Sequence, residues 1–270
     1  MSTPLPEMFE TLARAAHGAG RIVLDVREGG VNVRRKPDDS PVTQADTMAE
    51  EYIERALARA FPHLPLIGEE LTAAGRAVAP AERFFLVDPL DGTREFIAGR
   101  DSFSTNIALV EHGRPVAGVI YAPLRAEMVV GAPGAGLWRA RVDAHAPFDA
   151  SALRPFTPFD EPRPMRRAVV SFSHLDEKTL RWLKARGVTD QVRMGSAYKF
   201  CLLLTGEADV YPRFGPTMEW DTAAGHALLQ AAGGAVLLPD GSAPLTYGHV
   251  NRGFLNPGFV AFAPGVEVRT

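Results

Sequence analysis

VDPLDGTREF, residues 87–96, places two carboxylates at the end of a short apolar run. Pro89 stiffens the turn between Asp88 and Asp91, because its ring fixes a backbone dihedral angle. Leu90 adds a backbone carbonyl between them. Three oxygen donors can therefore converge, and oxygen donors are the ligands that Mg²⁺ prefers. The stretch predicts a buried strand that ends at a cation site.

Gly92 and Thr93 continue this stretch as the expected first residues of a helical turn. The free N–H groups and the positive dipole end of such a turn suit a phosphate oxygen. A cation site and an anion site would then be neighbours. A structural interpretation stays open from these residues alone, because aspartates in an Asp-Pro-x-Asp pattern also cap tight turns.

Other carboxylates stand at the ends of expected elements. Glu69 and Glu70 follow a short apolar run, and Asp221 begins an expected helix. Thr43 and Asp46 form a pattern like a capping box at another helix start. Each has a structural alternative: Glu69 as an exposed side chain, Asp221 as a helix N-cap and Asp46 as a capping partner. Together they supply enough oxygen ligands for the paired Mg²⁺ ions that serve hydrolytic phosphoryl transfer.

The composition is that of an ordinary globular protein. The 270 residues are 46% hydrophobic and 23% charged, with a net charge of −3, which gives no basic field for a nucleic acid polymer. The single cysteine, Cys201, excludes an internal disulfide framework and a cysteine-rich zinc site. No apolar run predicts integral membrane contact, and the amino-terminal stretch lacks a signal-peptide pattern. We expect a soluble, cytoplasmic protein; its oligomeric state is unknown from the sequence.

Periodicity predicts two halves of different character. The first half has expected helices at about 7–27 and from Thr43 to before Pro62, and expected strands at 84–88, 105–110, 116–122, 127–132 and 136–140. This pattern is α+β with an antiparallel meander. The loop-like stretch 141–168 is the expected boundary. The second half alternates expected strands at 168–173, 208–214, 235–239 and 259–263 with helices at 176–186, 196–205 and 221–232, which indicates α/β. The predicted domains are 1–155 and 156–270.

Three stretches, GEE at 68–70, DPLDGT at 88–93 and WDTAAGHA at 220–227, resemble the signature regions of the Mg²⁺-dependent, lithium-sensitive phosphatases that include inositol monophosphatase. Within that superfamily, DPLDGTREF with the following NIALVEHGRPVAGVIYAP, the region 195–227 and the terminal FLNPGF are similar to CysQ-type 3′(2′),5′-bisphosphate nucleotidases. The resemblance covers about residues 40–262. It implies a layered α/β/α/β/α sandwich of the sugar phosphatase type, with the active site between an α+β half and an α/β half.

The resemblance also implies residue roles. The metal ligands would be Glu69, Asp88, Leu90 through its carbonyl, Asp91 and Asp221, holding two or three Mg²⁺ ions. The catalytic residues would be Asp46, Thr93 and Glu69, with Asp46 and Thr93 orienting and deprotonating the attacking water. The substrate-binding residues would be Leu90, Asp91, Gly92, Thr93, His174, Ser196, Lys199, Arg213 and Asp221. Of these, Ser196, Lys199 and Arg213 would bind the phosphate that is not cleaved.

The expected activity is hydrolysis of 3′-phosphoadenosine 5′-phosphate (PAP) to AMP and phosphate, with the sulfated nucleotide PAPS as a second substrate. Two alternatives stay open: a phosphatase for inositol or fructose phosphates, and a non-catalytic nucleotide sensor. Inositol enzymes usually carry Thr-Asn-Phe where Arg94, Glu95 and Phe96 stand, and Leu71 gives no support to an inositol substrate. The presence of both Asp46 and Thr93 argues against a sensor, because a binding protein needs no water-activating pair.

Overall fold

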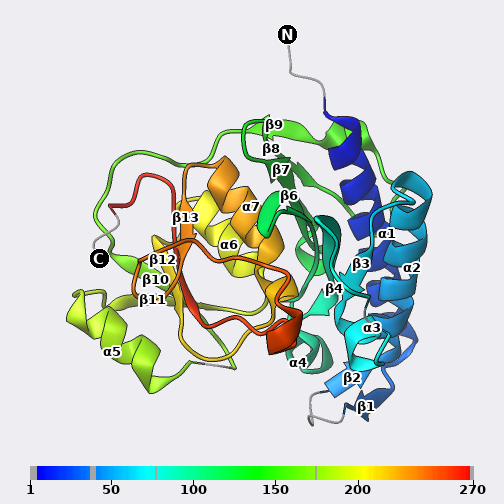
Figure 1. The fold of residues 1–270 in the computed structure, drawn as a ribbon, viewed down its shortest axis with the longest axis horizontal. Helices are drawn as coiled ribbons and strands as arrows, with labels where there is room; N and C mark the ends of the chain where they lie inside the picture. Colours follow the sequence, from blue (N-terminus) through cyan, green and yellow to red (C-terminus); the bar gives the residue numbers. More distant parts are fainter. Residues whose placement is uncertain (1–4, 37–40, 77, 174, 268–270) are drawn as a thin grey trace.

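A seven-stranded sheet forms from the first half of the chain (Figure 1). The computed structural model describes residues 5–36, 41–76, 78–173 and 175–267. The strands are β3 (Leu66–Gly68), β4 (Arg83–Asp91), β5 (Ser104–Glu111), β6 (Arg114–Ala122), β7 (Glu127–Ala132), β8 (Gly136–Arg141) and β9 (Arg154–Phe156), in that spatial order. Only the β3–β4 pair is parallel among these neighbours. The predicted antiparallel meander is confirmed.

A second, mixed sheet has five strands in the order β11-β10-β12-β14-β13. Its strands are β10 (Arg167–Ser171), β11 (Asp190–Met194), β12 (Val210–Arg213), β13 (Ala235–Leu237) and β14 (Phe259–Phe262). β10 runs parallel to β11 and β12, whereas β14 runs antiparallel to β12 and β13. A separate two-stranded ribbon, β1 (Val33–Arg35) and β2 (Pro41–Thr43), precedes the second helix.

The helices and the two sheets form five layers. The helices are α1 (Glu7–Gly29), α2 (Gln44–Ala60), α3 (Glu69–Ala73), α4 (Thr93–Ile97), α5 (Glu177–Ala185), α6 (Tyr198–Leu204) and α7 (Ala223–Ala231). Short 3-10 turns are η1 (Pro123–Arg125), η2 (Ala150–Ala152), η3 (Glu219–Asp221) and η4 (Val250–Arg252). α1 and α2 cover one face of the large sheet, α6 and α7 lie between the sheets, and α5 covers the outside of the small sheet (Figure 1). This is the expected α/β/α/β/α sandwich. Over the described ranges, no helix combines the length and the apolar character needed to cross a membrane.

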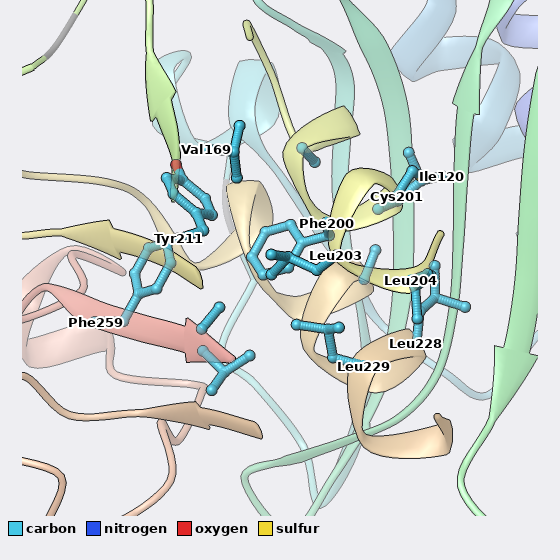
Figure 2. Close-up of a cluster of buried hydrophobic side chains, with 14 of the residues drawn as sticks. Ile120, Val169, Phe200, Cys201, Leu203, Leu204, Tyr211, Leu228, Leu229 and Phe259 are labelled. Carbon is cyan, nitrogen blue, oxygen red and sulfur yellow. The ribbon is translucent and has the colours of Figure 1, made fainter. Parts of the chain in front are cut away.

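The core between the two sheets joins the halves of the chain. Figure 2 shows Phe200 of α6 close to Tyr211 of β12 and Phe259 of β14, and the Phe200 and Tyr211 rings have centroids 5.5 Å apart. Gly118 of β6 lets α7 approach the large sheet, because a Cβ there would lie 2.6 Å from the carbonyl oxygen of Ala224. One hydrophobic cluster therefore contains residues from both halves, and the division at residue 155 stays a prediction.

Most expected elements are present, and the differences have local causes. The stretch 141–168 is not all loop, because it contains the edge strand β9, which pairs with β8. The sequence did not predict β9, because its residues are mainly exposed and show no apolar alternation. β11 was not expected for the same reason. The prediction that Asp221 begins a helix is wrong: Asp221 ends η3, since its Oδ2 accepts the Met218 N–H at 2.9 Å, and α7 begins two residues later.

Candidate active site

A cavity of about 340 Å³ lies between the two halves and collects most of the expected site residues. Its lining includes Glu69, Asp88, Leu90, Asp91, Gly92, Thr93, Ser196, Lys199, Arg213 and Asp221. Asp46 does not line it but lies directly behind Thr93, with 3.0 Å between its Oδ1 and the Thr93 hydroxyl. His174, expected in the nucleotide pocket, lies outside the described residues. The structure thus brings acidic side chains from three separate stretches to one cavity.

The end of β4 holds its two aspartates through its own backbone and its neighbours. The N–H of Leu90 donates to Asp88 Oδ1 at 3.0 Å, which closes a tight turn around Pro89. The pairing of β4 with β5 is irregular between the two aspartates, because proline cannot donate to the ladder. Asp91 Oδ2 accepts the N–H of Ala197 and, at 3.3 Å, the Asn106 amide. The turn-capping interpretation is therefore correct for Asp88, but Asp88 also lines the cavity.

The acidic end of the cavity has an excess of buried negative charge. Burial raises the pKa of Asp88 well above its usual range, and the nearby carboxylates of Glu69, Asp91 and Asp221 raise it further. Burial likewise raises the pKa of Asp221 well above its usual range, and the nearby carboxylates of Asp91 and Glu69 raise it further. Burial raises the pKa of Asp91 to about 6, against the opposing charge of Lys199. Carboxylates in this situation become more stable when a cation binds among them.

The donor set consists of hard oxygens, which fits Mg²⁺. As placed, no group of three acidic, histidine or cysteine side chains in the described part of the chain is close enough to hold an ion. Lys36 forms ion pairs at this end of the cavity: its Nζ lies 2.5 Å from Glu69 Oε1 and 2.6 Å from Glu70 Oε1. Burial lowers the pKa of Lys36, but the two glutamates outweigh that effect and hold it above its usual value. Lys36 contacts Glu69 through Oε1, and no contact of Lys36 with Glu69 Oε2 is seen.

Asp46 caps α2, as its sequence pattern predicted, and also contacts Thr93. Its Oδ2 accepts the N–H and the hydroxyl of Thr43 at 2.8 and 2.7 Å, which completes the capping box of α2. Its Oδ1 accepts the Thr93 hydroxyl, which also lies 3.2 Å from the carbonyl of Leu90. Burial raises the pKa of Asp46. The pair can take a proton from a water molecule that donates to Thr93, because Thr93 can pass its own proton to Asp46.

The opposite end of the cavity carries two buried cations. Lys199 is 4% exposed and Arg213 is 7% exposed. Lys199 donates to the carbonyl of Ser196 at 2.5 Å and lies 5.0 Å from the Tyr211 ring centroid, while Arg213 donates to the carbonyl of Pro216 at 2.7 Å. Neither forms an ion pair with a residue that the structure describes. Burial lowers the pKa of Lys199 to about 8. Two cations bonded to neutral carbonyls suit a phosphate ligand.

Some residues of the site were not predicted from the sequence. Lys36 holds the glutamates, and Asn106 donates to Asp91. Asn256 donates to the carbonyl of Met218 at 2.8 Å and to the Thr222 hydroxyl at 3.0 Å, so it braces the turn that carries Asp221. Asn106 and Asn256 both lie in stretches that carry the family resemblance, whereas Lys36 has no local signal, because its partners lie more than 30 residues away.

Comparison with known proteins identifies the family of this chain. The model of the inositol monophosphatase family matches residues 5–261. A 3′(2′),5′-bisphosphate nucleotidase CysQ from Salmonella typhimurium is 40% identical over 255 residues, covering 93% of this chain and 98% of the relative. The crystal structure of CysQ from Bacteroides thetaiotaomicron, described as a bacterial member of the inositol monophosphatase family, has a TM-score of 0.78 and 35% identity, covering 94% of this chain and 96% of that chain.

A structure of an inositol monophosphatase from Zymomonas mobilis is also similar, with a TM-score of 0.73 and 27% identity, covering 96% of this chain and 93% of that chain. The fold is therefore shared by relatives that are named for different phosphorylated substrates. Because the family model spans nearly the whole chain and the matched relatives are covered almost end to end, the protein belongs to the inositol monophosphatase family.

Proposed function

We propose that the protein is a Mg²⁺-dependent 3′(2′),5′-bisphosphate nucleotidase that converts PAP to AMP and phosphate. The observation that carries the proposal is the two-ended cavity, with buried carboxylates at one end and the buried cations Lys199 and Arg213 at the other. A substrate with two phosphates satisfies both ends. The relatives named as CysQ nucleotidases support the same substrate. PAPS, which also carries a 3′-phosphate, is the proposed second substrate.

The acidic end would hold the metal ions. The proposed ligands of two or three Mg²⁺ ions are Glu69, Asp88, Asp91, Asp221 and the carbonyl of Leu90, which all line the cavity. Bound ions of this kind neutralise the scissile phosphate and lower the pKa of a water molecule. Gly92 and Thr93, at the start of α4, would contact the same phosphate.

Asp46, Thr93 and Glu69 form the proposed catalytic set. The Thr93 hydroxyl oxygen would accept a hydrogen bond from the water molecule and so orient it. At the same time the Thr93 hydroxyl donates its own proton to Asp46. Glu69 is included in this set on the family resemblance, and it lines the same cavity as Thr93. The water oxygen attacks the phosphorus in line, the bond from phosphorus to the 3′-oxygen breaks, and the ribose leaves as an alcohol after taking up a proton.

The cationic end would bind the phosphate that stays on the product. Lys199 and Arg213 can each donate charge-assisted hydrogen bonds to it, and Ser196 offers a hydroxyl beside them. Ser196 has a φ of 51°, a conformation that non-glycine residues rarely adopt and that is often kept at functional sites. His174 remains a proposed contact of the nucleotide. A cytoplasmic location, where a free cysteine such as Cys201 stays reduced, completes the proposal.

The deciding experiment measures phosphate release from PAP and from inositol 1-phosphate at equal Mg²⁺ concentration, with and without EDTA. We expect a higher kcat/KM for PAP and no release in EDTA. A higher kcat/KM for inositol 1-phosphate would reject the nucleotide assignment. Binding of PAP without release of phosphate in Mg²⁺ would show a sensor in place of an enzyme.

A further inference from the structure

Glu95, on α4, is a buried carboxylate that the proposed chemistry does not use. It is 5% exposed and lines the active-site cavity two residues after Thr93. The hydroxyl of Ser173 donates to Glu95 Oε1 at 2.6 Å. Ser173 follows β10, so this hydrogen bond connects the first half of the chain to the second half beside the cavity.

Glu95 also supports the turn that carries Ser196. A Cβ on Gly195 would lie 2.9 Å from Glu95 Cγ and 2.4 Å from the carbonyl oxygen of Ser102. Only a residue without a side chain fits there, so the turn rests directly against Glu95. Ser171, Gly195 and Ser196 all line the cavity. The single side chain of Glu95 therefore contacts both segments that border the cationic end.

A second contact continues this connection toward the surface. Arg100 Nη1 lies 3.8 Å from Glu95 Oε1, and the Arg100 guanidinium lies 5.0 Å from the ring centroid of Phe172. Phe172 is 38% exposed, and a cation over an aromatic face contributes modestly at such a site. Glu95, Arg100, Phe172 and Ser173 thus form one group across the two halves, called here the Glu95 clamp.

We propose that the Glu95 clamp determines specificity for substrates with two phosphates. It holds the segment after β10 and the turn at 195–197 at a fixed separation from Thr93, and so sets the distance between the scissile phosphate and the cations that bind the second phosphate. Glu95 and Ser173 are positioning residues in this account. The inference rests on the proposed function, because the second phosphate is the group whose position the clamp sets.

The test compares PAP with p-nitrophenyl phosphate, which has one phosphate and needs no cationic end. Ser173→Ala removes the hydrogen bond to a buried carboxylate, so we expect about a tenfold rise in the KM for PAP with kcat within about twofold. The ratio of kcat/KM for PAP to that for p-nitrophenyl phosphate should fall by the same factor. Ser173→Thr, which keeps the hydroxyl, should restore the ratio. The double variant with Glu95→Ala should lose less than the product of the two single losses.

The matched control is Ser151→Ala, which removes a similar serine-to-aspartate hydrogen bond, of 2.9 Å to Asp149, on an exposed surface. It should leave the ratio unchanged. An equal loss on both substrates in Ser173→Ala would show that the residue acts through Thr93, and would overturn the proposal. If the wild-type protein does not hydrolyse PAP, the proposed function fails, and the clamp is then judged by calorimetry with AMP: Ser173→Ala should raise its Kd about tenfold, and an unchanged Kd would overturn the clamp.

Discussion

The two ends of the active-site cavity satisfy their buried charges in different ways. At the cationic end, Lys199 and Arg213 donate to backbone carbonyls, so each is hydrogen-bonded but not neutralised. At the acidic end, Asp88 and Asp221 repel each other and other carboxylates, and their pKa values are raised. Within the described residues, no anion forms an ion pair with Lys199 or Arg213, although Asp91 and Glu95 lie near Lys199, and no cation forms one with Asp88 or Asp221. A phosphorylated substrate with metal ions supplies both, because burial makes uncompensated charge costly.

Lys36 shows the same contrast from within the chain. Its ammonium group compensates Glu69 and Glu70. In the described part of the chain, Asp88, Asp91 and Asp221 form no ion pair. The comparison indicates that the aspartates depend on a bound ion more than the glutamates do. The following predictions test this difference, beginning with the largest effect.

Removal of divalent ions should have the largest effect, because it leaves the acidic end without its counter-charge. We expect no detectable phosphate release from PAP in EDTA and full recovery on addition of excess Mg²⁺. The Tm should also rise with Mg²⁺ concentration, since a ligand that binds only the folded state stabilises it. A phosphatase assay and thermal melts check both expectations. Full activity in EDTA would mean that the carboxylates do not serve as a metal site.

Asp91→Asn should lower kcat/KM for PAP by at least about 100-fold, the scale seen when a group that stabilises transition-state charge is lost. Asp91 borders both ends, since its Oδ2 accepts the N–H of Ala197 in the turn beside Lys199. Asp160→Asn, at an exposed position, is the matched control and should keep full activity. Near-normal turnover of Asp91→Asn would contradict the placement of the metal site.

Arg213→Gln should act on substrate binding. Loss of a charge-assisted hydrogen bond costs about 1.5–3 kcal/mol, so the KM for PAP should rise about 10- to 100-fold. Hydrolysis of p-nitrophenyl phosphate should change much less, because it has no second phosphate. Arg181→Gln, an arginine on the exposed face of α5, serves as the control. Equal losses on both substrates would show that Arg213 contributes to the chemistry and not to selection between substrates.

The pH dependence of stability should show the smallest effect. Burial raises the pKa of Glu50 and of Glu70 to about 7, so the folded protein holds more protons than the unfolded chain above about pH 4. The metal-free Tm should therefore fall as the pH rises from about 6 to about 7.5. Burial lowers the pKa of His226 to about 4, which opposes this trend only up to about pH 6.5, the imidazole's unfolded pKa.

Thermal melts in EDTA at the two pH values measure this change. Glu50→Gln should reduce the dependence, because its carboxyl no longer titrates. Its amide oxygen can accept only one of the two N–H groups, of Glu70 and Leu71, that the two carboxylate oxygens of Glu50 accept, so the Tm should be lower at both pH values. Addition of Mg²⁺ should stabilise the protein more at the higher pH, where the carboxylates are ionised. A metal-free Tm that rises between these pH values would contradict the excess of buried negative charge.

Local patterns predicted the parts of the fold whose cause is local. The capping box of Thr43 and Asp46 marked the start of α2 correctly, and alternating apolar residues between glycine and proline turns marked the meander. The sequence did not predict β9 and β11, because both are edge strands with mainly exposed residues. An edge strand is formed by pairing with its neighbour, and that pairing leaves little trace in the strand's own sequence.

The residues of the site also fall into those that a local pattern predicts and those that only tertiary packing brings together. Asp88, Leu90 and Asp91 could be expected as a set because one short turn brings them together. The arrival of Asp221 at the same cavity depends on α7 packing between the sheets and on Asn256 bracing η3. The sequence suggested that meeting from the place of Asp221 at the end of an expected element and from the family resemblance. The clamp and the Lys36 contact arise from tertiary packing, so no spacing rule could have predicted them.

The most direct measurement is a crystal structure of the protein soaked with Mn²⁺, in place of Mg²⁺, and with AMP. We expect anomalous peaks among the carboxylates of Glu69, Asp88, Asp91 and Asp221, with the AMP phosphate on Lys199 and Arg213. Manganese bound outside this cavity, or an AMP phosphate that leaves both cations without a ligand, would contradict it.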